Sequence, residues 1–168
     1  ATEVLGLTLP GAASIPAPDS RHAQMADLCG KRIVDMVWED LKPLDILTPA
    51  SFDNAITAVL ALGGSTNAIV HMIALAKRAG FELTLDRFDE LARRTPVLAN
   101  VRPSGKYLME DFYYAGGLRA LLSRITDLLD LQQRNVLNQT LDQALQGAQV
   151  YHDDVIRPRS QPLVEQDG

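Results

Sequence analysis

The stretch Leu62-Gly63-Gly64-Ser65-Thr66-Asn67-Ala68 lies between two apolar segments and decides how the middle of the chain folds. Glycine tolerates backbone conformations that are closed to other residues, so Gly63-Gly64 predicts a sharp turn that ends one helix. Ser65 or Thr66 can cap the next helix. The first turn of that helix presents unpaired N–H groups and the positive end of the helix dipole, which suit a carboxylate or another anion.

The same turn has a simpler interpretation that needs no ligand. A glycine C-cap followed by a Ser or Thr N-cap explains Gly63–Asn67, and local physics alone favours this interpretation. The turn also lacks the glycine–lysine ending of a phosphate-binding Walker loop. Both interpretations stay open at this level: a structural helix break, or a site for a small anion.

Apolar residues recur at helical spacing on both sides of this turn. Thr48-Pro49 predicts the start of the first helix, because a capping hydroxyl precedes a proline at the first helical position. The second helix runs towards Gly80. Since residues 55–76 are apolar on nearly every face, we expect both helices to be buried on more than one side, in the centre of a domain.

Start and stop signals predict the remaining elements. We expect an extended loop over 5–18, a helix of about 20 residues from Asp19 or Ser20 that ends at Pro43, a short helix after Thr84, a strand at Val97–Val101, a helix start at Leu108–Phe112, a helix over Leu118–Leu131, and a short helix from Asn138 or Thr140 to Leu145.

Composition restricts the class of protein. The 168 residues carry a net charge of −5 without a basic patch, which argues against a nucleic-acid partner. No apolar run reaches the roughly 20 residues that span a bilayer, and no signal peptide is visible, so we expect a cytoplasmic protein without a membrane partner. The single Cys29 allows no intrachain disulfide and no cysteine-only metal site, and we interpret it as a small core residue.

Two further segments could join a ligand pocket. His71 lies four residues after Asn67 on the same helix, so both could face one pocket, although a lone histidine on an apolar helix is more often a core residue. The turn Ser104–Lys106 offers a hydroxyl and a cation that could hold a carboxylate, and a plain surface turn explains it equally well. The acidic pairs Glu110-Asp111 and Asp153-Asp154 are interpreted as surface charge.

The chain resembles the dihydroxy-acid and phosphogluconate dehydratase family through motifs that follow one another along nearly its whole length. The strongest is Ala61–Ala68 followed by His71. The others are Leu7–Gly11 with Ser14–Ala17, Asp40–Pro43 with Asp45–Thr48, Phe52–Ile56, Thr95–Leu98, Pro103–Tyr107 with Met109-Glu110, Ala115–Gly117 and Val155–Pro158. Within the family, Phe112–Leu118 is most similar to the sugar-acid branch, and the branched-chain amino-acid enzyme is the nearest alternative.

The resemblance implies a hydro-lyase that converts a sugar acid or a dihydroxy acid into a 2-oxo acid. In that family an iron–sulfur cluster acts as Lewis acid on the leaving hydroxyl, a magnesium ion holds the carboxylate end, and a base removes the proton beside the carboxylate. The family's cluster cysteines and several magnesium ligands lie upstream of this chain, whereas a glutamate ligand and the serine base lie downstream. No catalytic or metal-binding residue is therefore carried over to this sequence.

What the resemblance carries over is a set of candidate pocket-wall residues: Gly64, Ser65, Thr66, Asn67, His71, Ser104 and Lys106. It implies an α/β fold class, with this chain as the helix-rich part of a layered N-terminal domain that has few short strands and lacks the family's β-barrel domain. We expect residues 1–150 to belong to that domain and residues 151–168 to form a linker towards the barrel. The expected partners are a small-molecule carboxylate substrate and copies of the same chain, in a dimer or tetramer.

Three hypotheses remain at this stage. The chain is a segment of a sugar-acid dehydratase that is inactive alone, a non-catalytic module that binds a small anion at Gly63–Asn67, or an interaction piece whose apolar helices form an interface.

Overall fold

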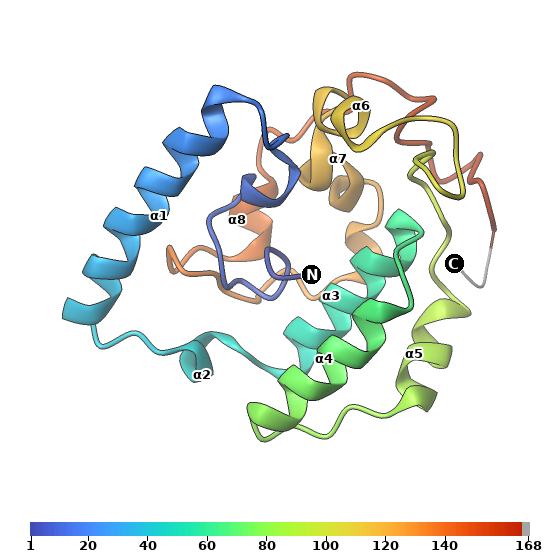
Figure 1. Ribbon diagram of the computed structural model, residues 1–168. Helices are drawn as coiled ribbons and strands as arrows, with labels where there is room; N and C mark the ends of the chain where they lie inside the picture. The colour runs from blue at the N-terminus through green and yellow to red at the C-terminus, as the bar shows by residue number, and fades with distance from the viewer. Residues whose placement is uncertain (166–168) are drawn as a thin grey trace.

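The computed structural model describes residues 1–165, which form helices joined by loops (Figure 1). The helices are α1 (Ser20–Trp38), α2 (Pro43–Ile46), α3 (Pro49–Leu62), α4 (Asn67–Arg78), α5 (Leu85–Ala92), α6 (Met109–Tyr114), α7 (Gly117–Ser123) and α8 (Leu141–Leu145), with short 3-10 turns η1 (Ala12–Ser14) and η2 (Thr126–Leu128). The prediction of a helix-rich chain is confirmed. Within residues 1–165 the backbone pairs only in isolated β-bridges, so the sheet of a layered α/β domain is not seen there.

Helix α3 is the buried centre of the molecule, as its apolar sequence predicts. The Thr48 hydroxyl accepts a hydrogen bond from the Ser51 N–H at 3.0 Å, and Pro49 occupies the first turn, so both predicted start signals are used. The helix ends at Gly63, which adopts the left-handed conformation with φ 70°. It lies against α4, α5 and α7 (Figure 1).

Helix α4 departs from the prediction that it is buried on several sides. Met72 and Ala76 are its buried residues, whereas Val70 keeps 67% of its surface exposed. The reason is that α4 lies over one side of α3, so that only the face turned towards α3 is covered (Figure 1). An apolar sequence all round a helix therefore does not by itself decide which side is covered.

Helix α1 begins as predicted and ends earlier than predicted. The Asp19 carboxylate caps its first turn by accepting the Arg21 N–H at 2.9 Å. The helix stops at Trp38 and does not continue to Pro43, because Asp40 adopts a left-handed backbone with φ 52° and the Leu41 N–H bonds back to the Met36 carbonyl at 3.0 Å. Pro43 instead starts α2.

The predicted helix over Leu118–Leu131 is too long. Helix α7 ends at Ser123, and the backbone at Ile125 leaves the helical region with φ −131°, which places its side chain in the core at 0% exposure. The next segment is fixed from α3: the Asn54 amide donates to the Asp130 carbonyl and accepts the Asp130 N–H, each at 2.8 Å. Burial and this side-chain clamp outweigh the helical spacing of the leucines.

The predicted strand at Val97–Val101 is wrong in form, although the segment is extended and buried. Val97, Ala99 and Val101 each make a single bridge, to three different places in the chain. The N–H groups of Leu98 and Ala99 both donate to the Ala61 carbonyl at the end of α3, at 2.9 and 3.2 Å. A helix end thus accepts hydrogen bonds that a neighbouring strand would otherwise take.

The chain after residue 150 returns to the core. Val155 and Ile156 are buried, and the Arg157 N–H donates to the Leu98 carbonyl at 2.9 Å. The division into residues 1–150 and a linker at 151–168 stays a prediction, and residues 166–168 of that linker lie outside the described part. Among residues 1–165 no helix is long and apolar enough to cross a membrane.

Replacing Ile156 with alanine tests whether this returning segment stabilises the core. Ile156 is 0% exposed, so Ile156→Ala should lower the free energy of unfolding by about 2–5 kcal/mol, measured by urea denaturation. Val164→Ala is the control on the same segment, because Val164 is 47% exposed and its truncation should cost within about 0.5 kcal/mol. Equal losses in the two variants would contradict the assignment of Ile156 to the core.

Candidate functional site

The turn between α3 and α4 is fixed by backbone hydrogen bonds. The Gly63 N–H donates to the Leu60 carbonyl at 2.9 Å, and the Gly64 N–H donates to the Val59 carbonyl at 2.8 Å. A methyl group on Gly64 would lie 2.7 Å from the Val59 side chain, so the backbone passes too close for a larger residue. The two glycines therefore allow the abrupt reversal that the sequence predicts.

The start of α4 uses one of the two predicted capping residues. The Ser65 hydroxyl accepts a hydrogen bond from the Asn67 N–H at 3.2 Å, whereas Thr66, at the N-cap position, makes no side-chain cap. Gly64 through Asn67 are exposed, so their backbone and hydroxyl groups face solvent. The turn is accessible to a ligand, and its hydrogen bonds are also those of an ordinary junction between two helices.

A hollow of about 240 Å³ lies beside this turn, among α3, α4 and α5. Gly64, Ser65 and Thr66 contribute to its wall. The rest is mainly apolar: Ile56, Val59, Leu60, Ile69, Met72, Phe88 and Ala92. Asp89, its one charged lining residue in the described chain, pairs with Arg93 at 2.8 Å. An acidic substrate would meet no cation on these walls, so this hollow does not suit a carboxylate.

The second candidate segment, the turn Ser104–Lys106, lies against the first. A methyl group on Gly63 would be 3.9 Å from the Ser104 hydroxyl oxygen, so the two turns are neighbours in space. Gly105 is packed even more tightly, because a methyl group there would lie 2.4 Å from the Asn100 carbonyl carbon. The Lys106 ammonium lies 5.0 Å from the centre of the Tyr107 ring and remains exposed.

A polar network beneath this turn was not predicted. The Tyr107 hydroxyl donates to one carboxylate oxygen of Asp154 at 2.6 Å, and the Arg157 guanidinium donates to the other at 2.9 Å. The hydrogen bond from Tyr107, with the positive charges of Arg157 and Lys106, lowers the pKa of the Asp154 carboxyl below its ordinary value of 3.8. Asp154 is thus held as a carboxylate, where the sequence suggested ordinary surface charge.

Asn100 connects this network to the turn. Its side-chain amide donates to the Asp154 carbonyl at 3.0 Å and accepts a hydrogen bond from the Lys106 N–H at 3.0 Å. Asn100 is only 6% exposed. Tyr107 and Asp154 are 47 residues apart, so no local spacing could have revealed their contact. The Lys106 N–H is therefore held by Asn100, and the Asn100 side chain is held in turn by the backbone of Asp154.

The two remaining candidates lie on α4. Asn67 and His71 are both exposed, and neither lines the hollow among α3, α4 and α5. The structure brings Gly63 to Ser104, but it gives His71 no contact with the Ser104–Lys106 turn in the described interactions. The assignment of all seven residues to a substrate pocket stays a prediction.

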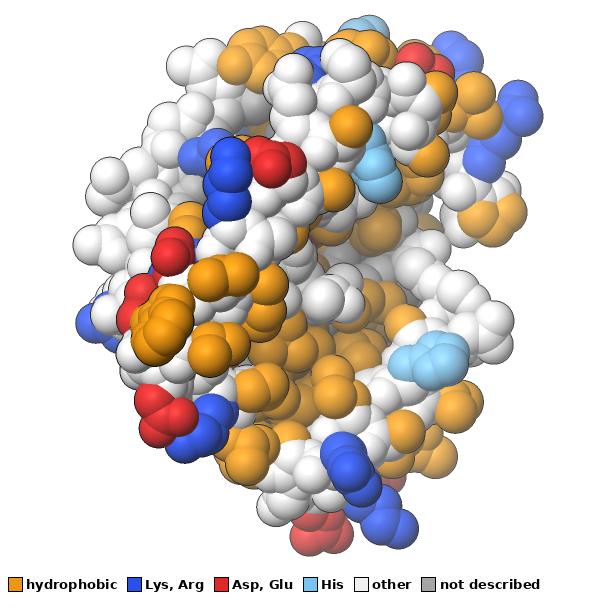
Figure 2. All heavy atoms as spheres, turned by 60° about the vertical axis from the view of Figure 1, so that its left-hand side comes forward, with side chains coloured by type: hydrophobic (Ala, Val, Ile, Leu, Met, Phe, Trp, Pro, Cys, Tyr) orange, Lys and Arg blue, Asp and Glu red, His pale blue; other side chains and the backbone are white. Residues whose placement is uncertain are grey.

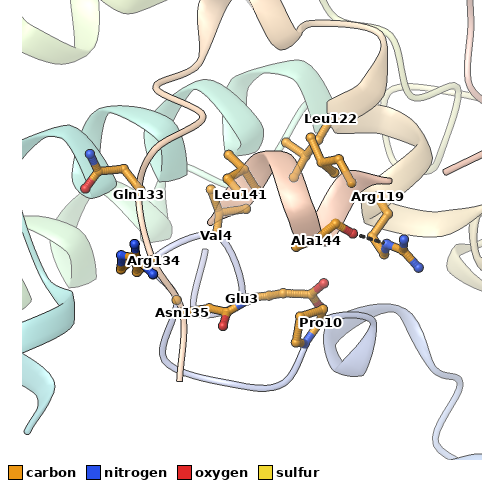
Figure 3. Close-up of a pocket in the computed structure, with 12 residues that line it drawn as sticks. Glu3, Val4, Pro10, Arg119, Leu122, Gln133, Arg134, Asn135, Leu141 and Ala144 are labelled. Atoms are coloured by element: carbon orange, nitrogen blue, oxygen red, sulfur yellow. Dashed lines mark hydrogen bonds between the residues drawn. The ribbon is translucent and has the colours of Figure 1, made fainter. Parts of the chain in front are cut away.

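A separate cavity among the N-terminal segment, α7 and α8 is too small for a substrate (Figure 3). It measures about 30 Å³, roughly the space of one water molecule. The Glu3 carboxylate at its wall accepts the N–H groups of Gly11 and Ala13 at 2.6 and 2.8 Å, and burial raises the pKa of Glu3. Arg119 donates to the Ala144 carbonyl at 2.7 Å. These contacts hold the N-terminal segment and α8 in place.

The described residues do not fit an iron–sulfur cluster or a magnesium ion. Among residues 1–165 no three His, Cys, Asp or Glu side chains converge as metal ligands. Cys29 lies on α1, where its sulfur is 4.0 Å from the Thr8 hydroxyl, and a cluster is held by several cysteines.

Comparison with known proteins gives a family. Residues 1–144 match the family described as dihydroxy-acid/6-phosphogluconate dehydratase, N-terminal. The chain is 48% identical over 162 residues to a 6-deoxy-6-sulfo-D-gluconate dehydratase of Pseudomonas putida, covering 96% of this chain and 28% of the relative.

Further relatives carry other substrate names. An L-arabinonate dehydratase of Rhizobium leguminosarum bv. trifolii (strain WSM2304) is 45% identical over 168 residues, 99% of this chain and 29% of the relative. A dihydroxy-acid dehydratase of Pyrococcus abyssi (strain GE5 / Orsay) is 41% identical over 169 residues, 99% of this chain and 31% of the relative. The chain therefore spans less than a third of the length of these curated relatives.

Gly105→Ala tests whether close packing shapes the Ser104–Lys106 turn. The added methyl group would overlap the Asn100 backbone at 2.4 Å, so the turn must move and the free energy of unfolding should fall by about 1–3 kcal/mol. Urea denaturation measures the loss. Ser104→Ala is the control, because this exposed side chain should change stability by less than about 0.5 kcal/mol. A Gly105→Ala variant as stable as the control would show that the turn is not constrained.

Asp154→Asn tests the polar network through pH. Because the folded-state pKa of Asp154 lies below 3.8, its carboxylate contributes stability above that pH, and the contribution is lost as the pH falls through the folded-state pKa. The variant should therefore lose less stability than the parent between neutral pH and pH values below 3.8, measured by denaturation at each pH.

Tyr107→Phe tests the same network over the same pH range as Asp154→Asn. It removes the hydrogen bond that contributes most to the lowered pKa, so the acid-dependent loss should become smaller here too. Parallel pH profiles for parent and both variants would overturn the proposed role of the network.

Proposed function

We propose that this chain, which belongs to the dihydroxy-acid/6-phosphogluconate dehydratase family, forms part of a hydro-lyase that removes water from a sugar acid to give a 2-oxo acid. The observation that carries the proposal is the family match over residues 1–144. Sugar acids are favoured over branched dihydroxy acids by the segment Phe112–Leu118 and by relatives whose names include sulfogluconate and arabinonate. We keep a cytoplasmic location as a prediction.

On this proposal the residues described here bind and position the substrate and do not perform the elimination. The Ser104–Lys106 turn offers an exposed ammonium and an exposed hydroxyl, and a carboxylate can accept hydrogen bonds from both kinds of group. Asn100 and the Asp154 network hold the backbone of Lys106. A carboxylate bound at a fixed cation is oriented before the reaction, which lowers the entropic part of the barrier.

The cofactors of the proposed reaction are an iron–sulfur cluster and magnesium, which the family resemblance implies. They would supply Lewis-acid chemistry at the leaving hydroxyl and a hold on the acid end of the substrate. Since the described residues offer no fitting ligand set, the proposal assigns those ligands to polypeptide other than residues 1–165. The 168-residue chain alone should accordingly show no turnover.

The test uses a polypeptide that extends residues 1–168 to the full length of the relatives, supplied with iron–sulfur cluster and magnesium. It should dehydrate aldonates faster than branched dihydroxy acids. Lys106→Ala should raise KM for the sugar acid at least about tenfold, because the substrate carboxylate loses its cation. A tenfold change corresponds to about 1.4 kcal/mol of binding free energy. Steady-state kinetics with both substrate classes measure each effect.

Two control variants make the result specific. Lys106→Arg retains the positive charge and should recover most of the binding. Lys77→Ala removes an exposed lysine away from the turn, on α4, and should leave KM unchanged. Preference for branched dihydroxy acids would overturn the sugar-acid proposal. An unchanged KM in Lys106→Ala would overturn only the role of the Ser104–Lys106 turn.

A further inference from the structure

Another hollow, of about 360 Å³, lies among the η1 turn, the start of α1, α6 and α7. We name it the α1–α7 hollow. It shares no lining residue with the hollow among α3, α4 and α5, and the proposed function gives it no role. Its volume falls within the roughly 300–1,000 Å³ of pockets that bind small organic molecules. The chemistry of its walls therefore decides which molecule it suits.

Two arginines line the α1–α7 hollow, and none of its lining residues in the described chain is acidic. On the face that carries α1, acidic and basic side chains are scattered and form no large patch of one sign (Figure 2). A charged ligand beside α1 therefore depends on the few groups around its own site. Those groups are Arg21 of α1 and Arg119 of α7, which favour an anion.

Arg119 is held by main-chain oxygens. Its guanidinium donates to the Ala144 and Gln146 carbonyls at 2.7 and 2.8 Å. The Glu3 carboxylate, which acts on Arg119 electrostatically, is itself bound by two backbone N–H groups of the N-terminal segment. A carbonyl does not neutralise a guanidinium, so Arg119 brings positive charge to the wall of the hollow.

Arg21 is positioned by an aromatic ring and a carboxylate. Its guanidinium lies over the Tyr113 ring, 4.8 Å from the ring centre, and donates to the Asp19 carboxylate from two of its nitrogens. A guanidinium carries more N–H donors than this pair uses, and its planar fork matches the two oxygens of a carboxylate. Asp19 offsets part of the charge, but Arg21 keeps donors for a ligand in a fixed place.

The η1 turn and the start of α7 add a hydroxyl to the wall. The Ser14 hydroxyl accepts a hydrogen bond from the Leu118 N–H at 3.0 Å, so its own O–H can donate to a ligand. A methyl group on Gly117 would lie 2.9 Å from the Ser14 oxygen, so the α7 backbone passes close to η1. The segments Ser14–Ala17 and Ala115–Gly117, which carry part of the family resemblance, thus meet at this wall.

The rest of the wall is largely apolar. Ile15, Met25 and Leu28 line the hollow, and Leu28 keeps 51% of its surface exposed. A carbon chain that lies against these side chains removes apolar surface from water, which favours binding. An inorganic anion has no such chain. The walls therefore suit an organic acid better than phosphate or sulfate.

We propose that the α1–α7 hollow binds a small aliphatic carboxylic acid, with its carboxylate at Arg21 and Arg119 and its carbon chain against Ile15, Met25 and Leu28. The site is distinct from the turn proposed to hold the substrate, and the proposal does not rest on the proposed function. Because the two arginines lie on different helices, a bound acid links α1 to α7.

Protection of Arg21 from chemical modification tests the site in the polypeptide of full relative length. Phenylglyoxal modifies accessible arginine side chains, and mass spectrometry of the digested protein gives the rate at each arginine. Saturating 3-methylbutanoate should slow the modification of Arg21 at least about threefold, because the bound carboxylate covers its guanidinium. Arg78, an exposed arginine at the end of α4, is the internal control and should react at an unchanged rate.

Two further probes separate the charge of the ligand from its apolar contact. 3-Methylbutanamide has the same shape without the charge and should give no protection. Acetate keeps the charge but lacks the chain, so it should need at least about tenfold higher concentration for half protection. Protection by the amide, or equal potency of acetate, would overturn the proposal. An Arg21 that does not react even without a ligand would show that other polypeptide fills the hollow, and would overturn it too.

Leu28→Asp tests the apolar wall itself. The new carboxylate repels the ligand and removes an apolar contact, so the concentration of 3-methylbutanoate for half protection should rise at least about tenfold. Val34→Asp is the matched control, because Val34 is 55% exposed on the same helix and does not line the hollow. Both side chains are exposed, so both variants should keep the circular dichroism of the parent. A rise in both variants, or in neither, would contradict the proposed site.

Discussion

The burial of α3 is the constraint on which the other elements depend. Phe52, Ile56 and Ala61 are almost completely inaccessible to solvent, and Ala61 lies on another side of the helix from Phe52 and Ile56. A helix that is apolar in this way is stable only when neighbours cover it, because burial of its side chains supplies most of the free energy of folding. Helices α4, α5 and α7 provide this cover, together with the extended segment at 97–101.

The C-terminal end of α3 joins this core to the candidate site. The Ala61 carbonyl accepts N–H groups from the extended segment, and two residues later Gly63 begins the turn that approaches Ser104. The same extended segment carries Asn100, whose side chain fixes the Lys106 backbone. The contacts that pack the core therefore also position the surface turns, so a structural change in one shifts the other.

Electrostatics give the site its local character within an acidic chain. The net charge is −5, yet Lys106 and Arg157 gather near Asp154, whose lowered pKa keeps the carboxylate charged. Such a mixture can hold a small anion only where a cation is left accessible, and Lys106 is exposed. The apolar hollow beside α4 and α5 lacks this property. Recognition of an acid is accordingly favoured at the Ser104–Lys106 turn.

The sequence by itself determined the local events. Thr48-Pro49, the glycine pair at 63–64 and Asp19 specified where helices begin or end, because caps and left-handed turns depend on residues within a few positions. It also identified the family, because ordered motifs retain that information along the chain.

Only the tertiary structure decided which faces are covered and which distant groups meet. It left one side of α4 and one side of α1 exposed, shortened α7 so that Ile125 fills the core, and replaced the expected strand by isolated bridges and hydrogen bonds to a helix end. It also joined Tyr107 to Asp154. These outcomes depend on contacts between residues far apart in sequence. Burial and hydrogen bonding at those contacts outweigh the structural preference set by local residue spacing, and no single segment contains both partners of such a contact.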